Sequence, residues 1–172
     1  MESFEMLLKR RAIRSFRTEA VPSQILEKIL LAARYAPSAL GLQNRHFTVV
    51  ENKSLMADIV TATERHGGKF VPGHIPFYNA PDVVVLSAPA DFQYNREDIG
   101  LAAQNLMLAA YALGLGSCFI GSVQPGLRDP EILKRLQLPQ NYLPFAGISV
   151  GYPAGEAPEP KERRTDDVNW IR

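Results

Sequence analysis

The chain has little cysteine and little histidine, and both shortages exclude kinds of site. Its 172 residues include one cysteine, Cys118, and three histidines. A single thiol cannot form an intrachain disulfide, a multi-thiolate zinc site or an iron–sulfur cluster, and it fits a reducing compartment. The histidines at positions 46, 66 and 74 show no metal-ligand spacing. The sequence therefore predicts a protein without a metal site.

Charge of one sign and long apolar runs are also lacking. Lysine and arginine number 19 against 18 acidic residues, a formal net charge of +1, which argues against a nucleic-acid surface. No apolar run approaches the roughly 20 residues that span a bilayer, and the acidic Glu2 and Glu5 do not fit a signal peptide. Since 46% of the residues are hydrophobic, we expect one soluble, cytoplasmic domain without nucleic-acid or membrane partners.

The apolar pattern predicts an α+β domain of about four strands with helices on both faces. Pro37 should end one helix at Ala36, while Ser54 and Asn95 are expected to cap two later helices and Asp129 a last one. The expected helices cover residues 4–9, 25–36, 54–67, 98–113 and 131–138, and the expected strands cover residues 47–51, 82–88, 117–120 and 145–150.

Two features predict self-association. The helix expected at residues 98–113 carries an apolar stripe rich in alanine, which permits close packing in the centre of a domain or of a dimer. Beyond Gly151 the chain is rich in proline and charge, yet it ends in Val168, Trp170 and Ile171. Such a tail is expected to dock on something, for which a second subunit is a candidate.

The most informative polar feature is a cluster of three arginines, Arg10, Arg11 and Arg14, at the end of the first expected helix. Guanidinium groups present a planar set of donors suited to phosphate and to heterocycle carbonyls. The cluster is also compatible with a solvated basic turn. A second basic group at residues 161–164, in a nearly neutral chain, favours the anion site.

In their order and spacing, four segments resemble the FMN-dependent nitroreductase family, over nearly the whole chain. They are residues 10–16 (Arg-Arg-Ala-Ile-Arg-Ser-Phe), 33–47 with Ala-Pro-Ser-Ala and Gln43, 98–121 with Asn105 and Gly-Leu-Gly-Ser-Cys, and 151–163 with Gly-Tyr-Pro and Lys-Glu-Arg. The resemblance implies one nitroreductase-like domain over residues 1–172, with a mixed, mostly antiparallel central sheet flanked by helices. It also implies a homodimer in which residues 152–172 form an arm that docks on the partner.

The resemblance further implies which residues bind FMN. The arginine segment and the late basic pair meet the phosphate and the pyrimidine edge, the loop after the second helix reaches the flavin from the partner subunit, and other backbone passes the ring. The implied residues are Arg10, Arg11, Ala12, Arg14, Pro37, Ser38, Ala39, Gly41, Gln43, Asn79, Ile120, Gly121, Lys161 and Arg163.

The activity implied by this resemblance is hydride transfer from NADPH or NADH through FMN to a small acceptor in a ping-pong reaction. Nitroaromatics, quinones and activated alkenes are candidate acceptors, and no catalytic side chain is needed because the flavin carries the chemistry. Two alternatives stay open at this stage. One is a non-catalytic FMN-binding carrier or sensor, and the other is a phosphate- or nucleotide-binding module whose arginines serve a different ligand.

Several positions depart from the family pattern or have simpler interpretations. Ala12 replaces a common Ser, Gly41 replaces a common Asn, and Asn44-Arg45 stands where Pro-Trp is usual. Asn105 on a helix often satisfies a neighbouring backbone group, and Cys118 fits a small buried hydrophobic residue. These departures weaken any transfer of substrate specificity from the family.

Overall fold

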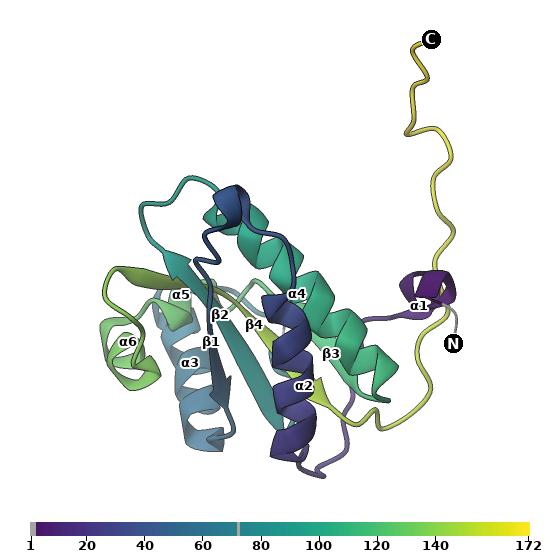
Figure 1. The fold of residues 1–172 in the computed structure, drawn as a ribbon. Coiled ribbons are helices and arrows are strands. Elements are labelled where there is room, and N and C mark those ends of the chain that lie inside the picture. Colours follow the sequence, from purple (N-terminus) through teal and green to yellow (C-terminus); the bar gives the residue numbers. More distant parts are fainter. Residues whose placement is uncertain (1–2, 72) are drawn as a thin grey trace.

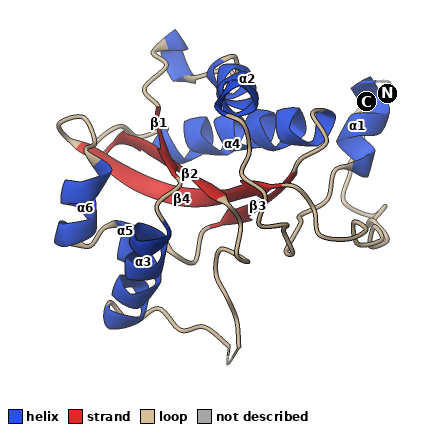
Figure 2. Cartoon of the chain, turned by 90° about the horizontal axis from the view of Figure 1, so that it is seen from below, coloured by secondary structure: helices blue, strands red, loops and turns tan. Residues whose placement is uncertain are grey.

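The computed structural model describes residues 3–71 and 73–172 and is built around a four-stranded sheet (Figures 1 and 2). The strands are β1 (His46–Val50), β2 (Asp82–Pro89), β3 (Gly116–Ile120) and β4 (Tyr142–Gly151). Their order is β1-β2-β4-β3, and all three pairings are antiparallel. Helices lie on both faces of the sheet (Figure 2), so the predicted α+β class is confirmed.

The two inner strands explain the apolar run around residue 84. Val83, Val84, Val85 and Leu86 are all fully buried in β2. Because β2 lies between β1 and β4 and helices cover both faces, successive side chains meet a core on either side. The strand predicted at residues 82–88 is therefore confirmed, and it is one of the two inner strands of the sheet.

One face of the sheet is covered by α2 (Ser23–Arg34) and α4 (Asn95–Ala112). Ala102, Ala103 and Ala110 are buried between α4 and its neighbours, so the alanine-rich stripe belongs to the core of the domain. The amide of Asn105 donates to the Ala32 carbonyl at 3.1 Å. Its role as a partner for a neighbouring backbone group is thus confirmed.

The other face is covered by α3 (Lys53–Arg65), α5 (Gln124–Leu127) and α6 (Pro130–Leu136). Asp129 caps α6 as predicted, since its Oδ1 accepts the Glu131 N–H at 2.9 Å. The sequence pattern did not predict α5, which is too short to show a helical period. It packs so tightly on α3 that position 126 needs a glycine, since a Cβ at Gly126 would overlap the Ile59 carbonyl oxygen.

Two predicted helix caps are wrong. Asn52, two residues before Ser54, caps α3 by accepting the Leu55 N–H at 2.9 Å. Asn95 lies inside the first turn of α4, and its side chain instead donates to the Pro89 carbonyl at 3.1 Å. Cap residues have short polar side chains that serve several backbone partners, so the folded chain decides which one is used. The helix α2 also ends at Arg34, two residues earlier than expected.

The N-terminal helix α1 (Ser3–Lys9) lies beside the sheet near the outer strand β3 (Figure 2). The segment after it is attached to the sheet, because the Ile13 N–H donates to the Ser117 carbonyl at 3.0 Å and Arg17 N–H donates to the Tyr152 carbonyl at 2.9 Å. The C-terminal tail leaves from the same region and projects away from the fold (Figure 1). Within residues 3–71 and 73–172, no helix combines the length and apolar character that crossing a membrane requires.

Candidate functional site

The arginine segment lies along the outer edge of β3. Ala12 forms a bridge with Ser117, and this contact holds the backbone between Arg10 and Arg14 against the strand. Burial raises the pKa of the Cys118 thiol, while the positive charges of Arg14 and Arg10 oppose that rise. Both guanidinium groups are therefore close enough to Cys118 to act on its charge. The buried thiol itself matches the predicted hydrophobic role.

Arg10 is half-buried beside a small cavity of about 130 Å³, which Ser117, Pro153 and Gly155 also line. Burial is the main cause of a lowered pKa of Arg10, and the neighbouring Arg11 charge lowers this pKa further. An anion bound here would offset both effects, since an opposite charge favours the ionised guanidinium.

Arg11 lines the same cavity, but its guanidinium is bonded to backbone at the end of its own helix. Its Nη1 donates to the Leu8 carbonyl at 2.6 Å and to the Arg10 carbonyl at 2.8 Å. These carbonyls belong to the C-terminal end of α1, where a cation also suits the helix dipole. In this arrangement Arg11 stabilises the helix end, and Arg10 and Arg14 are the better candidates for a ligand.

Arg14 lies over the ring of Tyr78, with its Cζ 6.0 Å from the ring centroid. The two residues line an open recess of about 270 Å³ together with His74 and Asn79. Tyr78 and Asn79 both adopt left-handed backbone conformations, with φ of 54° and 56°. Non-glycine residues adopt this conformation at an energetic cost, and such positions concentrate at functional sites. The predicted residues Arg14 and Asn79 thus meet in one recess.

The position of Asn79 depends on a lysine that the sequence pattern did not single out. Lys53 Nζ donates to the Ala80 carbonyl at 2.7 Å and to the Pro81 carbonyl at 2.8 Å. Asn79 also borders a larger recess of about 520 Å³ on the α3 side. Lys53 therefore anchors the backbone at the border between the two recesses.

Ile120 and Gly121 lie at the end of β3. Ile120 is buried in the core below the sheet, in the same cluster as Cys118. Gly121 is exposed, and its carbonyl accepts the Gln124 N–H at 3.1 Å. The backbone at the end of β3 is therefore accessible at Gly121.

The structure places the loop of residues 37–43 at the opposite edge of the sheet. This loop, which contains the short 3-10 helix η1 (Ala39–Gly41), leads directly into β1. Since β1 and β3 are the two outer strands, Pro37, Ser38 and Gln43 are remote from the arginines within one chain. A single subunit consequently does not bring the two halves of the predicted site together.

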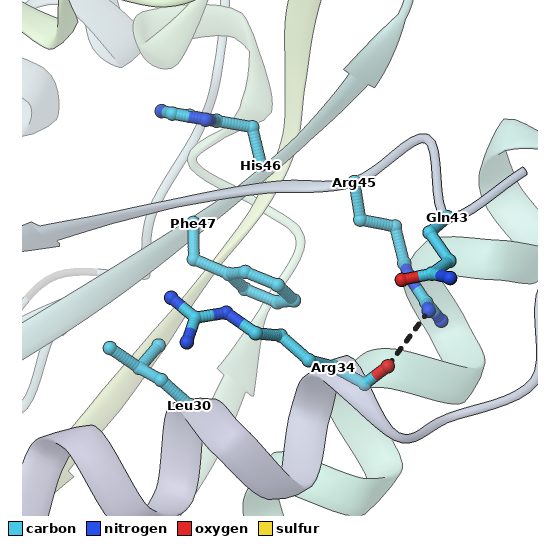
Figure 3. A pocket seen from close by; sticks show the side chains of 6 residues that line it. All are labelled: Leu30, Arg34, Gln43, Arg45, His46 and Phe47. Atoms are coloured by element: carbon cyan, nitrogen blue, oxygen red, sulfur yellow. Dashed lines mark hydrogen bonds between the residues drawn. The ribbon is translucent and has the colours of Figure 1, made fainter.

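A recess of about 320 Å³ lies beside this loop (Figure 3). Gln43 is the predicted site residue that borders it, next to Arg34, Arg45 and His46. Arg45 reaches back across the loop toward the carbonyl of Arg34, whereas the Arg34 side chain extends along Phe47 (Figure 3).

Lys161 and Arg163, the basic residues near the end of the chain, contact each other in the tail. Arg163 Nη1 donates to the Lys161 carbonyl at 3.1 Å, and both residues are exposed. Gly155 and Ala157 still line the cavity at Arg10, and the tail beyond them leads away from the fold (Figure 1). Lys161 and Arg163 are therefore not gathered with the first arginine group in this chain.

Together, the β3 edge offers what a phosphorylated, planar cofactor requires. Arg10 and Arg14 supply cationic donors, Tyr78 supplies an aromatic surface, and Gly121 leaves backbone accessible. The sequence pattern did not single out Tyr78. Its position after a Pro-Phe pair carries no helical or strand period, so only the tertiary contact with Arg14 identifies it.

Comparison with known proteins places these features in context. The model of the nitroreductase family matches residues 7–67 and 73–152. A curated relative from Methanothermobacter thermautotrophicus, provisionally named NADH dehydrogenase/NAD(P)H nitroreductase, is 31% identical over 158 residues, which cover 90% of this chain and 78% of the relative.

Two solved structures match the fold over 100% of both chains. A nitroreductase with bound FMN from Bacteroides fragilis has 26% sequence identity and a TM-score of 0.87. A nitroreductase with bound FMN from Desulfitobacterium hafniense has 25% identity and a TM-score of 0.88.

Proposed function

The chain belongs to the nitroreductase family, and from this premise we propose that it is an FMN-dependent oxidoreductase that uses NAD(P)H. Two full-length structural matches contain FMN, and NAD(P)H is part of the name of the curated relative. The observation that carries the proposal is the pair Arg10 and Arg14 at the β3 edge. None of the described residues accepts a hydrogen bond from either guanidinium.

The proposed cofactor site is built from both ends of the chain. Arg10 and Arg14 bind the phosphate and the pyrimidine edge, Asn79 meets the ring edge, and the Ile120–Gly121 backbone passes the ring. Lys161 and Arg163 reach the same phosphate when the tail is docked. Arg11 and Ala12 contribute mainly by holding the segment in place, which the contacts of Arg11 with its own helix support.

FMN held by Arg10 and Arg14 would supply the chemistry of hydride transfer from NAD(P)H to a second substrate. The protein side chains contribute binding, orientation and charge. A guanidinium next to the pyrimidine edge stabilises negative charge that develops there on reduction. Tyr78 adds an aromatic surface next to the Arg14 guanidinium, whose Cζ lies 6.0 Å from the ring centroid.

We further propose that the active form is a homodimer with FMN at the interface. The loop residues Pro37, Ser38, Ala39, Gly41 and Gln43 lie at the β1 edge, so a second copy has to supply them to the arginines at β3. Large apolar side chains on α1, on this loop and on the tail are exposed in the single chain, and they supply the surface for association. They include Phe4, Leu8, Leu40, Val168, Trp170 and Ile171.

The proposed second substrate is a small acceptor such as a nitroaromatic, a quinone or an activated alkene. The first test is the visible absorption spectrum of the purified protein, followed by addition of NADPH or NADH without oxygen. A yellow protein that bleaches supports a reducible FMN. Steady-state NAD(P)H oxidation with a quinone or nitroaromatic then separates an enzyme from a carrier or sensor. A protein that stays colourless after incubation with FMN and removal of the excess would refute the proposal.

Arg14→Ala tests the cofactor site directly. Losing one charge-assisted contact should weaken FMN binding by about 1 to 3 kcal/mol, measured as the dissociation constant of FMN from fluorescence quenching. Lys9→Ala is the matched control, because Lys9 is in the neighbouring helix but pairs with Glu5 at 3.0 Å on the surface. Unchanged FMN affinity in Arg14→Ala would remove Arg14 from the site.

A further inference from the structure

The loop between α2 and β1 has an unfavourable backbone for its sequence. Leu40, Gly41 and Gln43 have φ angles of 54°, 66° and 55°, so three of four consecutive residues are left-handed and two of them carry side chains. Such a conformation persists only where surrounding contacts hold it. The contacts that do so here come from α4 on one side and from the start of β1 on the other.

Asp98 holds the loop from the side of α4. Its Oδ1 accepts the Ala39 N–H at 2.8 Å, and the residue is only 1% exposed. The second carboxylate oxygen, Oδ2, is buried and has no hydrogen-bond partner within the part of the chain that the structure describes. Burying a carboxylate is unfavourable. The charge-assisted bond to the loop and the N-terminal turn of α4 both compensate for it.

Arg45 holds the loop from the other side. Its guanidinium donates to the Pro37 carbonyl at 3.0 Å, the Ala36 carbonyl at 2.9 Å and the Arg34 carbonyl at 3.3 Å. The last of these contacts is drawn in Figure 3. One planar guanidinium thus donates to three carbonyls at and beyond the end of α2. A lysine ammonium lacks this planar arrangement of donors. Arg45 is also one of the positions at which this chain departs from the family pattern.

The loop closes on itself between these two anchors. Ser38 Oγ accepts the Gln43 N–H at 3.0 Å, and the Gly41 N–H donates to the Ser38 carbonyl at 3.0 Å. The amides of Ala39, Gly41, Leu42 and Gln43 all have acceptors in this arrangement. Their hydrogen exchange therefore reports directly on whether the loop keeps its conformation.

We infer that Asp98 and Arg45 are positioning residues, which hold the loop of residues 38–43 in the shape that meets FMN of the partner subunit. This inference rests on the proposed function. Neither side chain needs to touch the cofactor, because each acts through backbone groups of the loop. A preformed loop loses less conformational entropy on binding, so FMN affinity depends on the two anchors.

The experiment compares four variants, Asp98→Ala, Asp98→Asn, Arg45→Met and Arg34→Met, by loop amide exchange without FMN and by FMN dissociation constant. Asp98→Ala and Arg45→Met should speed exchange of the Ala39–Gln43 amides and weaken FMN binding. We expect each change to be about tenfold or more, since Asp98→Ala loses one charged hydrogen bond and Arg45→Met loses three. Asp98→Asn keeps an acceptor oxygen and should restore both values. It also guards against the alanine variant merely failing to fold.

Arg34→Met is the matched control, because Arg34 borders the same recess as Arg45 but its side chain extends along Phe47 (Figure 3). It should leave loop exchange and FMN affinity within twofold of the unmodified protein. If Arg34→Met weakens FMN binding as much as Arg45→Met does, the positive charge of the recess determines FMN affinity. The positioning role of Arg45 is then overturned. Faster loop exchange with unchanged FMN affinity overturns it as well.

A different result would refute the proposed function, namely that the unmodified protein does not bind FMN at all. In that case loop exchange still tests the two anchors. Slow exchange that persists in both Asp98→Ala and Arg45→Met overturns their role whatever the ligand.

Discussion

At the scale of single residues, one close contact holds the arginine segment in place. Gly116 lies on β3 directly under Ile13, and a Cβ at position 116 would come within 2.7 Å of the Ile13 Cβ and Cγ1 atoms. In the fold Gly114, with φ of 77°, follows the helix end, and Gly116 allows the segment with Arg10 and Arg14 to approach the strand.

We predict that Gly116→Ala displaces this segment. The overlap should lower the free energy of unfolding by about 1 to 3 kcal/mol, measured by urea denaturation, and it should weaken FMN binding in parallel. Gly100→Ala is the control, since a Cβ there meets nothing within 4 Å and the site is inside α4. That variant should gain about 0.5 to 1 kcal/mol from helix propensity. Full FMN affinity in Gly116→Ala would show that the segment does not depend on this contact.

At the scale of elements, a polar junction joins the end of α3 to the start of α6. Asp129 Oδ2 lies 3.2 Å from Arg65 Nη1 and 2.9 Å from His66 Nε2, while its Oδ1 caps α6 through Glu131. The His66 hydrogen bond is the main reason that the pKa of Asp129 is lowered, and the backbone donors of α6 and the Arg65 charge add to it. One carboxylate thereby links two helices on the same face of the sheet.

The stability contributed by this junction should depend on pH. Because the pKa of Asp129 is lower in the folded chain, its contribution is complete above the ordinary aspartate value of about 3.9 and is lost as the pH falls through the folded value. Asp129→Asn keeps the cap but removes the charge. It should therefore be less stable than the unmodified protein at pH 7, with the difference shrinking toward pH 3.

Denaturant unfolding of both proteins between pH 3 and pH 7 checks this prediction. The control is Asp166→Asn, which removes a carboxylate paired with Arg164 in the exposed tail, where an ion pair contributes little to stability. A difference between Asp129→Asn and the unmodified protein that stays constant with pH would contradict the electrostatic origin.

At the scale of the whole molecule, the candidate site is divided between two edges of one sheet. The arginines lie at β3 and the loop of residues 37–43 lies at β1, so one chain does not bring the two halves of the predicted site together. The tail beyond residue 157 extends away from the domain (Figure 1), with Trp170 80% exposed and Ile171 98% exposed. A second copy would resolve both features by supplying the loop and covering the tail.

Trp170 is the single tryptophan of the chain, so its fluorescence reports on the tail alone. We predict a blue-shifted emission at high protein concentration, where the indole is buried on a partner, and a shift to longer wavelength on dilution. Removal of residues 158–172 should lower the molar mass measured by light scattering toward that of one chain and should weaken FMN retention. Emission typical of exposed tryptophan at every concentration would contradict docking of the tail.

The sequence by itself determined the kinds and order of the elements except for the short helices η1 and α5. The apolar run at residues 83–86, the helical stripe around Leu106 and the Asp129 cap each depend on neighbours within a few positions, so local periodicity predicts them. The arginine segment could likewise be singled out, because three guanidinium groups so close in sequence cannot all be buried.

Only the tertiary structure decided which of these groups meet. In the fold, Arg14 lies over Tyr78, and Arg11 binds backbone at the end of its own helix. Asp98 and Arg45 contact the same loop from opposite sides. Asp98 and Ala39 are 59 positions apart in sequence. Such contacts arise from the packing of whole elements against each other, which no local pattern records, because their free energy is gained only when the core is assembled.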